Sequence, residues 1–177
     1  MTTDMKQWKE YYDADVRRYG KSGASILKFQ KYLRKAHFCK NRILWMYYKW
    51  RIKQYRMKYG LEIKPEGDIG RGLYIGHAFN INIHPKAVIG ENFSIHKGAV
   101  IGQQNRGKRK GAPKIGNRVW VGINAVVVGN ITIGDDVLIA PLTHVNCDVP
   151  SHSVVYGNPC IIKHRDNATE GYITNQV

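Results

Sequence analysis

From residue 61 onward, an isoleucine or valine recurs at almost every sixth position of the chain. The grid positions are Ile63, Ile69, Ile75, Ile81, Ile83, Ile89, Ile95, Ile101, Ile115, Val121, Val127, Ile133, Ile139 and Val145, with a two-residue shift after Ile81 and an interruption after Ile101. A period of six matches neither the alternation of a flat strand nor the 3.6-residue turn of a helix. Hexapeptide repeats of this kind build a parallel β-helix, in which each repeat supplies one short strand and one corner. We therefore expect a mainly β fold, a triangular prism whose β-branched residues stack inward.

The interruption of the grid, "QQNRGKRKGAP" at residues 103–113, is polar, strongly basic and free of grid residues. It should protrude from the prism as a loop, and long excursions of this kind usually carry a function. After Val145 the pattern decays, which predicts a cap on the open end of the prism and then a tail over residues 166–177.

The first 60 residues have a different pattern. Residues 5–59 contain no proline, and glycine only at Gly20 and Gly23. Residues 25–60 have apolar positions near helical spacing with basic residues between them; these positions are Phe29, Leu33, Ala36, Ile43, Tyr47 and Trp50. We expect two helices separated at Gly20–Gly23. The predicted organisation is a helical segment over 1–60, a β-helix domain over 61–165 and the tail.

Charge separates these two parts of the chain. The net charge is +15, and residues 1–60 hold 16 basic and 4 acidic side chains of the total. The basic, aromatic helices over 24–59 could pack on the prism or on another subunit, or could lie on an anionic membrane surface. Nucleic-acid binding is disfavoured because basic charge is accompanied by no recognisable reading motif.

The start of the chain has no apolar signal-like region, and "ILWMYY" is too short to span a bilayer. Cys39, Cys147 and Cys160 are odd in number and too scattered for a disulfide framework or a zinc knuckle. A reduced, cytoplasmic protein is expected, with a peripheral position at the inner membrane face as the alternative.

Residues 61 to about 163 resemble the left-handed β-helix acyltransferases with hexapeptide repeats. The segments that carry the resemblance are "IGRGLYIGHA", "IHKGAVIG", "PKIGNRVWVGINAVVVGNITIGDDVLIA" and "DVPSHSVVYGNPC". Within that family the chain is similar to the serine acetyltransferases and their relatives in polysaccharide biosynthesis. The resemblance implies a left-handed β-helix, acetyl-CoA as co-substrate in a groove between subunits, and a homotrimer. No metal is expected, and pairing of trimers into hexamers stays open.

His77, in "YIGHAFN", aligns with the family's catalytic histidine and is the candidate general base, because a histidine pKa lies close to working pH. His96 is the second candidate catalytic residue. If the two-residue shift is correct, Ile95 stacks over Ile75 and His96 over Gly76, within a few ångströms of His77.

Two positions depart from the serine acetyltransferases. That family has an aspartate directly before the first histidine, where this chain has Gly76, and a second histidine just before Pro-Lys-Ile, where this chain has Ala112. The intervening loop keeps four cations, at Arg106, Lys108, Arg109 and Lys110. We interpret it as an acceptor loop for a larger or anionic acceptor, such as a sugar on a phosphate-linked carrier.

For the coenzyme, the resemblance indicates "VGINA" and "IAPLT" along the pantetheine arm and the end of the domain near the phosphates. The candidate cofactor-binding residues are Gly122, Asn124, Ala125, Ala140, Pro141, Pro159, Lys163 and Arg165. Trp120 is expected to form part of the groove wall. Lys163 and Arg165 are assigned to the phosphates because those groups need fixed positive charge.

The expected function is acetyl-CoA-dependent O-acetylation of a sugar hydroxyl in surface or capsular polysaccharide biosynthesis, with serine O-acetylation in cysteine biosynthesis as the alternative. Two other hypotheses stay open. One is a metal-dependent hydratase of the same fold, which needs three histidine ligands. The other is a non-enzymatic trimeric scaffold.

Overall fold

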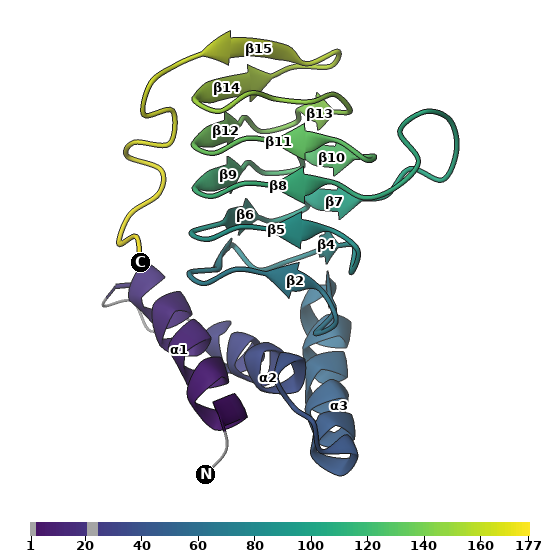
Figure 1. Ribbon diagram of the computed structural model, residues 1–177, viewed down its shortest axis with the longest axis vertical. Coiled ribbons are helices and arrows are strands. Elements are labelled where there is room, and N and C mark those ends of the chain that lie inside the picture. The colour runs from purple at the N-terminus through teal and green to yellow at the C-terminus, as the bar shows by residue number, and fades with distance from the viewer. Residues whose placement is uncertain (1–2, 21–24) are drawn as a thin grey trace.

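The structure, a computed structural model, describes residues 3–20 and 25–177. Three helices precede a column of short strands (Figure 1). The helices are α1 (Thr3–Arg18), α2 (Leu27–His37) and α3 (Arg42–Tyr59). The strands are β1 (Leu61–Ile63), β2 (Asp68–Ile69), β3 (Tyr74–Gly76), β4 (Ile81–Ile83), β5 (Val88–Ile89), β6 (Ser94–His96), β7 (Val100–Gly102), β8 (Lys114–Ile115), β9 (Val119–Val121), β10 (Val126–Val128), β11 (Thr132–Ile133), β12 (Val137–Ile139), β13 (His144–Val145), β14 (Ser153–Tyr156) and β15 (Ile161–His164).

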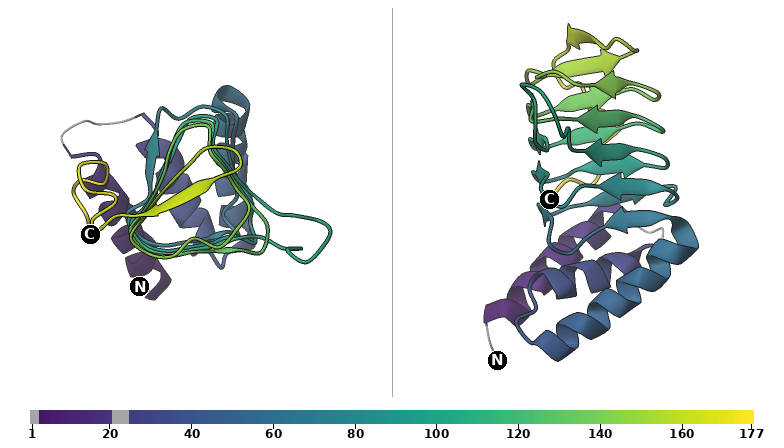
Figure 2. Two further views of the ribbon diagram at one scale, coloured as in Figure 1. Left: turned by 90° about the horizontal axis from the view of Figure 1, so that it is seen from above. Right: turned by 90° about the vertical axis from the view of Figure 1, so that its right-hand side faces the viewer.

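The strands form the three faces of a triangular prism, which Figure 2 shows from above. We name each face after its first strand. The β1 face has the order β1-β4-β7-β10-β13, the β2 face β2-β5-β8-β11, and the β3 face β3-β6-β9-β12-β14-β15. All strand pairs are parallel except β14 with β15. The predicted fold class, a left-handed β-helix preceded by a short helical segment, is confirmed.

The six-residue grid is the core of the prism. All fourteen grid side chains are buried, none more than 4 % exposed. Ile83 pairs with Ile101, eighteen positions further on, which is one coil of three hexads. Ile101 pairs with Val127, 26 positions further on, because this coil also holds the 103–113 loop. The loop leaves the column between β7 and β8, as predicted (Figure 1).

The helical segment differs from the prediction in one place. Residues 25–60 were expected to form one helix, but the chain breaks at residues 38–41 between α2 and α3. The Asn41 side chain accepts hydrogen bonds from the backbone amides of Ile43 and Leu44, both at 3.0 Å, and so caps the start of α3. Gly20, with φ of 58°, follows α1, and the rest of the expected Gly20–Gly23 break lies outside the described residues.

The helices close the lower end of the prism with buried polar side chains. Arg34 forms a bidentate ion pair with Asp15 at 2.8 and 2.9 Å and donates to the carbonyl oxygens of Ile69 and Gly70, both at 2.7 Å. Asp15 also accepts a hydrogen bond from the backbone amide of Leu73 at 2.8 Å. These side chains take the place of a further coil, because the first coil has no strand below it to satisfy its backbone.

The upper end is closed by the chain turning back on itself. Strand β15 runs antiparallel to β14, and the tail after it descends the outer side of the β3 face to α1 (Figure 1). Buried Asp136 anchors the tail by accepting hydrogen bonds from the Thr169 hydroxyl at 2.6 Å and from the backbone amides of Ala168 and Thr169. Lower down, Asn92 and Val177 exchange two hydrogen bonds of 2.9 Å.

Candidate active site

His77 lies at the corner of the prism between the β3 face and the β1 face. Gly76 pairs with His96 before this corner and Asn82 pairs with Val100 after it, so the two-residue shift of the grid falls between Gly76 and Asn82. The longer corner leaves His77 exposed with a φ of 51°, in the left-handed region that few side chains occupy. Nine other described non-glycine residues share this conformation, Asn124 and Leu142 of the stacked corners among them, so it belongs to the turns of the fold and does not by itself distinguish His77.

The second histidine lies beside the first, as the register argument predicted. Ile75 pairs with Ile95 and Gly76 with His96, and the ring centroids of His77 and His96 are 6.4 Å apart. The Nδ1 atom of His96 is 3.0 Å from the carbonyl oxygen of Val121. Because a carbonyl can only accept, Nδ1 carries the proton and a neutral His96 has a free acceptor lone pair on Nε2.

Burial keeps His96 in that neutral form. Removal from solvent lowers the pKa of His96 below its usual value, and the charge of a protonated His77 would lower that pKa further. The Val121 carbonyl acts in the opposite direction but is outweighed. A neutral imidazole beside an exposed histidine can accept a hydrogen bond from its N–H or from a hydroxyl held between the two rings.

Gly76 makes room for the His96 ring. A Cβ atom placed on Gly76 would lie 2.5 Å from Nε2 of His96, closer than real side chains come. This is the position where the serine acetyltransferase resemblance leads one to expect an aspartate. Residue 76 has no side chain in this protein, and the ring of His96 occupies the space that one would fill. An imidazole, rather than a carboxylate, therefore lies next to His77.

The corners stacked above His77 contain most of the predicted pantetheine residues. Backbone hydrogen bonds of 3.0 Å link each corner to the next, from Gly98 to Phe79, from Asn124 to Lys97 and from Leu142 to Ile123. Asn124 and Pro141 are exposed on this edge, whereas Gly122 is buried against the backbone of Ala140 and Pro141. Two large apolar side chains also face solvent here, Phe79 at 61 % and Leu142 at 71 % exposure. The edge thus offers an apolar surface beside the histidines.

The four remaining candidate cofactor residues do not all fit that role; they are Ala125 and, near the upper end, Pro159, Lys163 and Arg165. Ala125 is fully buried, its amide donates to Gly122 and its carbonyl accepts from Val100, so it has no polar group to offer a ligand. Pro159 lies in the turn after β14, above the same corner. Lys163 and Arg165 lie on the return path along β15, and Arg165 bonds to His152, beyond the far end of β14. The structure does not bring Arg165 to the His77 corner.

The basic loop lies at another corner. It leaves the prism between the β1 face and the β2 face, whereas His77 lies between the β3 face and the β1 face. Figure 2 shows the loop projecting away from the triangle. Paired backbone bonds of 2.9 Å between Gln104 and Gly111 close its neck, and its four cations are exposed beyond them. In this chain the acceptor loop and His77 are therefore separated by one face of the prism.

Two residues around His96, Tyr74 and Tyr172, were not found from the sequence, whereas Trp120 was expected as part of the groove wall but not as a neighbour of His96. The ring of Trp120 lies 4.6 Å from His96 and 5.0 Å from Tyr172 of the tail, and Tyr74 lies 6.1 Å from His96. A hollow of about 250 Å³ opens here. It is lined by Arg18, Tyr19, Tyr74, His96, Tyr172, Thr174 and Asn175. The tail has no repeat pattern, so only the folded structure shows that it reaches the β3 face.

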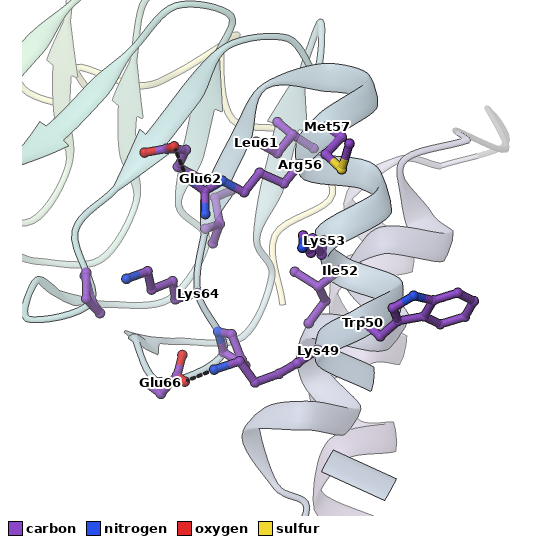
Figure 3. Close-up of a pocket in the computed structure, with 13 residues that line it drawn as sticks. Lys49, Trp50, Ile52, Lys53, Arg56, Met57, Leu61, Glu62, Lys64 and Glu66 are labelled. Atoms are coloured by element: carbon purple, nitrogen blue, oxygen red, sulfur yellow. Dashed lines mark hydrogen bonds and ion pairs between the residues drawn. The ribbon is translucent and has the colours of Figure 1, made fainter. Parts of the chain in front are cut away.

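A cleft of about 930 Å³ lies elsewhere, between α3 and the first coil. Figure 3 shows its walls, from Lys49 and Met57 on the helix to Glu62 in β1 and Glu66 in the turn after it. It contains none of the predicted site residues. Within residues 3–20 and 25–177, no three His, Cys, Asp or Glu side chains come together as a metal site would require.

Comparison with known proteins shows which proteins the prism is similar to. Residues 112–147 match the family model described as bacterial transferase hexapeptide (six repeats). A serine acetyltransferase of Helicobacter pylori is 40% identical over 99 residues, covering 56% of this chain and 58% of that protein. The serine acetyltransferase of Staphylococcus xylosus is 38% identical over 112 residues, 63% of this chain and 52% of that one. Part of the prism is therefore similar in sequence to hexapeptide-repeat transferases, and the similarity to serine acetyltransferases extends over more than half of the chain.

Solved structures extend the likeness to the helices. The soybean serine acetyltransferase apoenzyme superposes with a TM-score of 0.74 at 28% identity, covering 89% of this chain and 69% of that one. The Neisseria gonorrhoeae enzyme gives 0.74 at 28% identity over 91% of this chain and 67% of that one. The chain spans somewhat more than half the length of the curated relatives it matches. These relatives are serine acetyltransferases, so the comparisons favour the serine hypothesis and lend no support to the polysaccharide branch.

Proposed function

We propose that the protein is an acetyl-CoA-dependent O-acetyltransferase in which His77 is the general base. The observation that carries the proposal is the His77 corner itself. An exposed histidine in a left-handed conformation lies next to a neutral second histidine, at the foot of a partly apolar edge formed by the stacked corners. The similarity to serine acetyltransferases at 36–41% identity supports the same chemistry.

In the proposed reaction, His77 takes the proton of the acceptor hydroxyl as its oxygen attacks the thioester carbonyl of acetyl-CoA. The tetrahedral intermediate collapses with cleavage of the carbon–sulfur bond. The departing CoA thiolate takes the proton back from His77, so the enzyme returns to its starting state. His96 accepts a hydrogen bond at Nε2 from His77 or from the acceptor, and thereby fixes the orientation of the pair.

For the acceptor, the first candidate is L-serine, because the relatives that match are named for it. A second candidate is a sugar hydroxyl, and a specific observation favours it. Gly76 and Ala112 occupy the two positions where the resemblance leads one to expect an aspartate and a histidine. Their absence removes two groups that could hold the charged ends of an amino acid, while the exposed cations of the loop suit an anionic acceptor.

The coenzyme is placed by this proposal along the stacked corners, with Asn124 and Pro141 beside the pantetheine arm. Lys163 supplies positive charge near the upper end for the CoA phosphates. A homotrimer completes the arrangement. The acceptor loop lies one prism face away from His77 of its own chain, and a threefold packing of prisms would bring the loop of one subunit beside the His77 corner of the next.

The experiment is thiol release from acetyl-CoA by the purified protein, with L-serine and a panel of sugars and nucleotide sugars offered in parallel. His77→Ala should lower kcat by about 10²–10⁴-fold with whichever acceptor is used. The matched control is His37→Ala. His37 is exposed at the end of α2, in the helical segment, which contains none of the candidate site residues, and its Nδ1 lies 2.8 Å from the Pro65 carbonyl oxygen.

The outcomes separate the two acceptors. Turnover with serine that is lost in His77→Ala but kept in His37→Ala establishes the serine reaction. Turnover with sugars alone, again dependent on His77, establishes the second candidate. Equal activity of the wild type and the His77→Ala variant would contradict the role of His77 with either acceptor.

A further inference from the structure

One side of α3 is an apolar stripe that the other described parts of the chain leave largely exposed. Its members are Ile43, Met46, Tyr47, Trp50 and Met57, which are 79, 57, 46, 53 and 79 % exposed. Their spacing of three, four or seven residues places them on one side of the helix. Leu44, at 48 % exposure, lies at the edge of the stripe. We call these six residues the α3 stripe.

The opposite side of α3 accounts for the packing of the helix. Ile52 is buried, and the rings of Tyr48 and Tyr55 lie 6.3 and 6.5 Å from Tyr32 of α2. Figure 3 shows Trp50 directed away from the prism while Ile52 lies on the side of β1. Within the stripe, the ring of Tyr47 also lies 6.4 Å from Tyr32, and Trp50 and Met57 border the cleft beside the first coil. All three side chains nevertheless remain 46 % or more exposed, so packing within the described chain does not account for the stripe. Apolar patches of this kind usually mark an interaction surface.

Charge decides what kind of partner the stripe fits. The sequence from residue 24 to residue 60 contains eleven lysines and arginines and no aspartate or glutamate. Lys49 and Arg56 form exposed ion pairs with Glu66 and Glu62 of the first coil. Among the described residues, Arg42 and Lys53 form no ion pair with an acidic side chain. The stripe is thus bordered by an excess of positive charge.

A second copy of the chain fits this surface poorly. Two stripes packed against each other would bring their cationic borders together without acidic groups on either helix to compensate, and like charges at close range repel. An anionic partner gains from the same charges. Tryptophan, tyrosine, isoleucine and methionine beside lysines and arginines are the residue types of helices that lie in the interface of an anionic bilayer. The side of α3 that packs on α2 and β1 is apolar as well, so the helix as a whole is only weakly amphipathic and the argument depends on its exposed residues.

We propose that α3 binds the surface of an anionic lipid membrane, with the α3 stripe in the headgroup region and the flanking cations on lipid phosphates. The long side chains of Arg42 and Lys53 can reach the phosphates while their methylene groups lie along the apolar region. Of the helices described, none is both long enough and apolar enough to cross a membrane, so this contact is with one surface. The proposal does not depend on the identity of the acceptor.

The test is co-flotation of the full chain with lipid vesicles of two compositions, neutral phosphatidylcholine alone and the same lipid with about one-third phosphatidylglycerol. We expect the protein to float with the anionic vesicles, and added salt to weaken binding because it screens the lysines and arginines. The variant Ile43→Ser/Met46→Ser/Trp50→Ser should lower the partition coefficient by about tenfold or more. These side chains are mainly in solvent, so the fold should survive, which circular dichroism would check.

The matched control is Val88→Ser/Ile161→Ser, which removes two apolar side chains that are 44 and 52 % exposed on the prism. It should float like the wild type. A charge variant, Arg42→Gln/Lys53→Gln, should reduce binding to anionic vesicles at low salt and leave the weak binding to neutral vesicles unchanged.

Three results would overturn the proposal. The first is no flotation with anionic vesicles. The second is flotation that the stripe variant does not change. The third is a stripe variant whose mass in sedimentation equilibrium is half that of the wild type, because the stripe would then join two copies or two trimers. Thiol release with a soluble acceptor is measured separately, so failure of membrane binding leaves the proposed reaction untouched.

Discussion

The two ends of the prism hydrogen-bond their strand edges with different groups, backbone at the upper end and side chains at the lower end. Each end exposes strand edges that must be hydrogen-bonded or covered. At the upper end, β15 turns back along β14 and the backbone provides the bonds. At the lower end, the chain arrives from α3 directly into β1, and side chains from α1 and α2 provide them.

The comparison shows that a helical segment can act as a terminal coil when it carries the right polar groups. Gln30 donates to the Leu73 carbonyl and Arg18 to the Gly72 carbonyl, each at 2.7 Å, and both side chains are buried. Burial lowers the pKa of Arg18 to about 10, which still leaves it charged at neutral pH. A buried charge is costly unless its partners are complete, so the lower end should be the more sensitive of the two to mutation.

The largest expected effect is at the Arg34–Asp15 pair. Arg34→Met leaves the Asp15 carboxylate buried without its partner and leaves two backbone carbonyls of the first coil without donors. The free energy of unfolding should fall by about 3–5 kcal/mol. Urea denaturation followed by circular dichroism would measure it, and a loss of less than ~1 kcal/mol would show that the pair does not hold the lower end.

The next effect is at Asp136, which anchors the tail below the upper end. Burial raises the pKa of Asp136, but the hydrogen bonds from Thr169, His152 and Ala168 outweigh it, and the pKa lies below its usual value. Asp136→Asn should cost about 1–2 kcal/mol, because a charge-assisted acceptor is lost. It should also speed tryptic cleavage at Arg165 relative to the wild type.

The same residue gives a pH dependence with a defined sign. A carboxyl whose pKa is lowered by folding contributes its full stabilisation above its unfolded pKa of about 3.9. That contribution is lost as the pH falls through the lower, folded value. Cleavage at Arg165 by an acid-active protease should therefore rise below pH of about 4 in the wild type, and Asp136→Asn should lack this part of the dependence.

The smallest effect is expected at Arg71, the exposed counterpart of Arg34. Arg71 also joins the helical segment to the prism, through Glu10 at 2.7 Å and Glu91 at 2.8 Å, but all three side chains are largely solvated. Arg71→Gln should change the unfolding free energy by less than about 1 kcal/mol, since exposed ion pairs contribute little. A cost near that of Arg34→Met would mean that burial is not what separates the two arginines.

Much of the prism was predictable because its core repeats. The fourteen grid residues are buried, and the same count of six gave the stacking of His96 over Gly76. The lower cap was not predictable. Its four buried polar residues have the spacing and polarity of ordinary surface residues; they are Asp15, Arg18, Gln30 and Arg34. They are buried only because the first coil of the prism lies against them. The break before α3 depends on one Asn41 side chain within an otherwise continuous helical pattern.

The candidate site was predictable in part for the same reason. His77 was found by resemblance, and its neighbour by counting residues around the coil. The separation of the loop corner from the His77 corner depends on which face each strand joins. The order of the strands along the chain gives that assignment once the length of a coil is known. The approach of Tyr172 to Trp120 has no such rule, because the tail follows the side-chain contacts available on the β3 face.

The neck of the 103–113 loop has a consequence for how such proteins diversify. The loop adds eight residues to one coil, and its ends are joined by the Gln104–Gly111 bridge, while Ile101 and Ile115 keep their places in the stack on either side. A segment attached in this way can be lengthened, shortened or exchanged without shifting a single grid residue. Under the proposed function, in which this loop contacts the acceptor, acceptor preference could change over evolutionary time, or by grafting in the laboratory, while the scaffold that supports His77 stays constant.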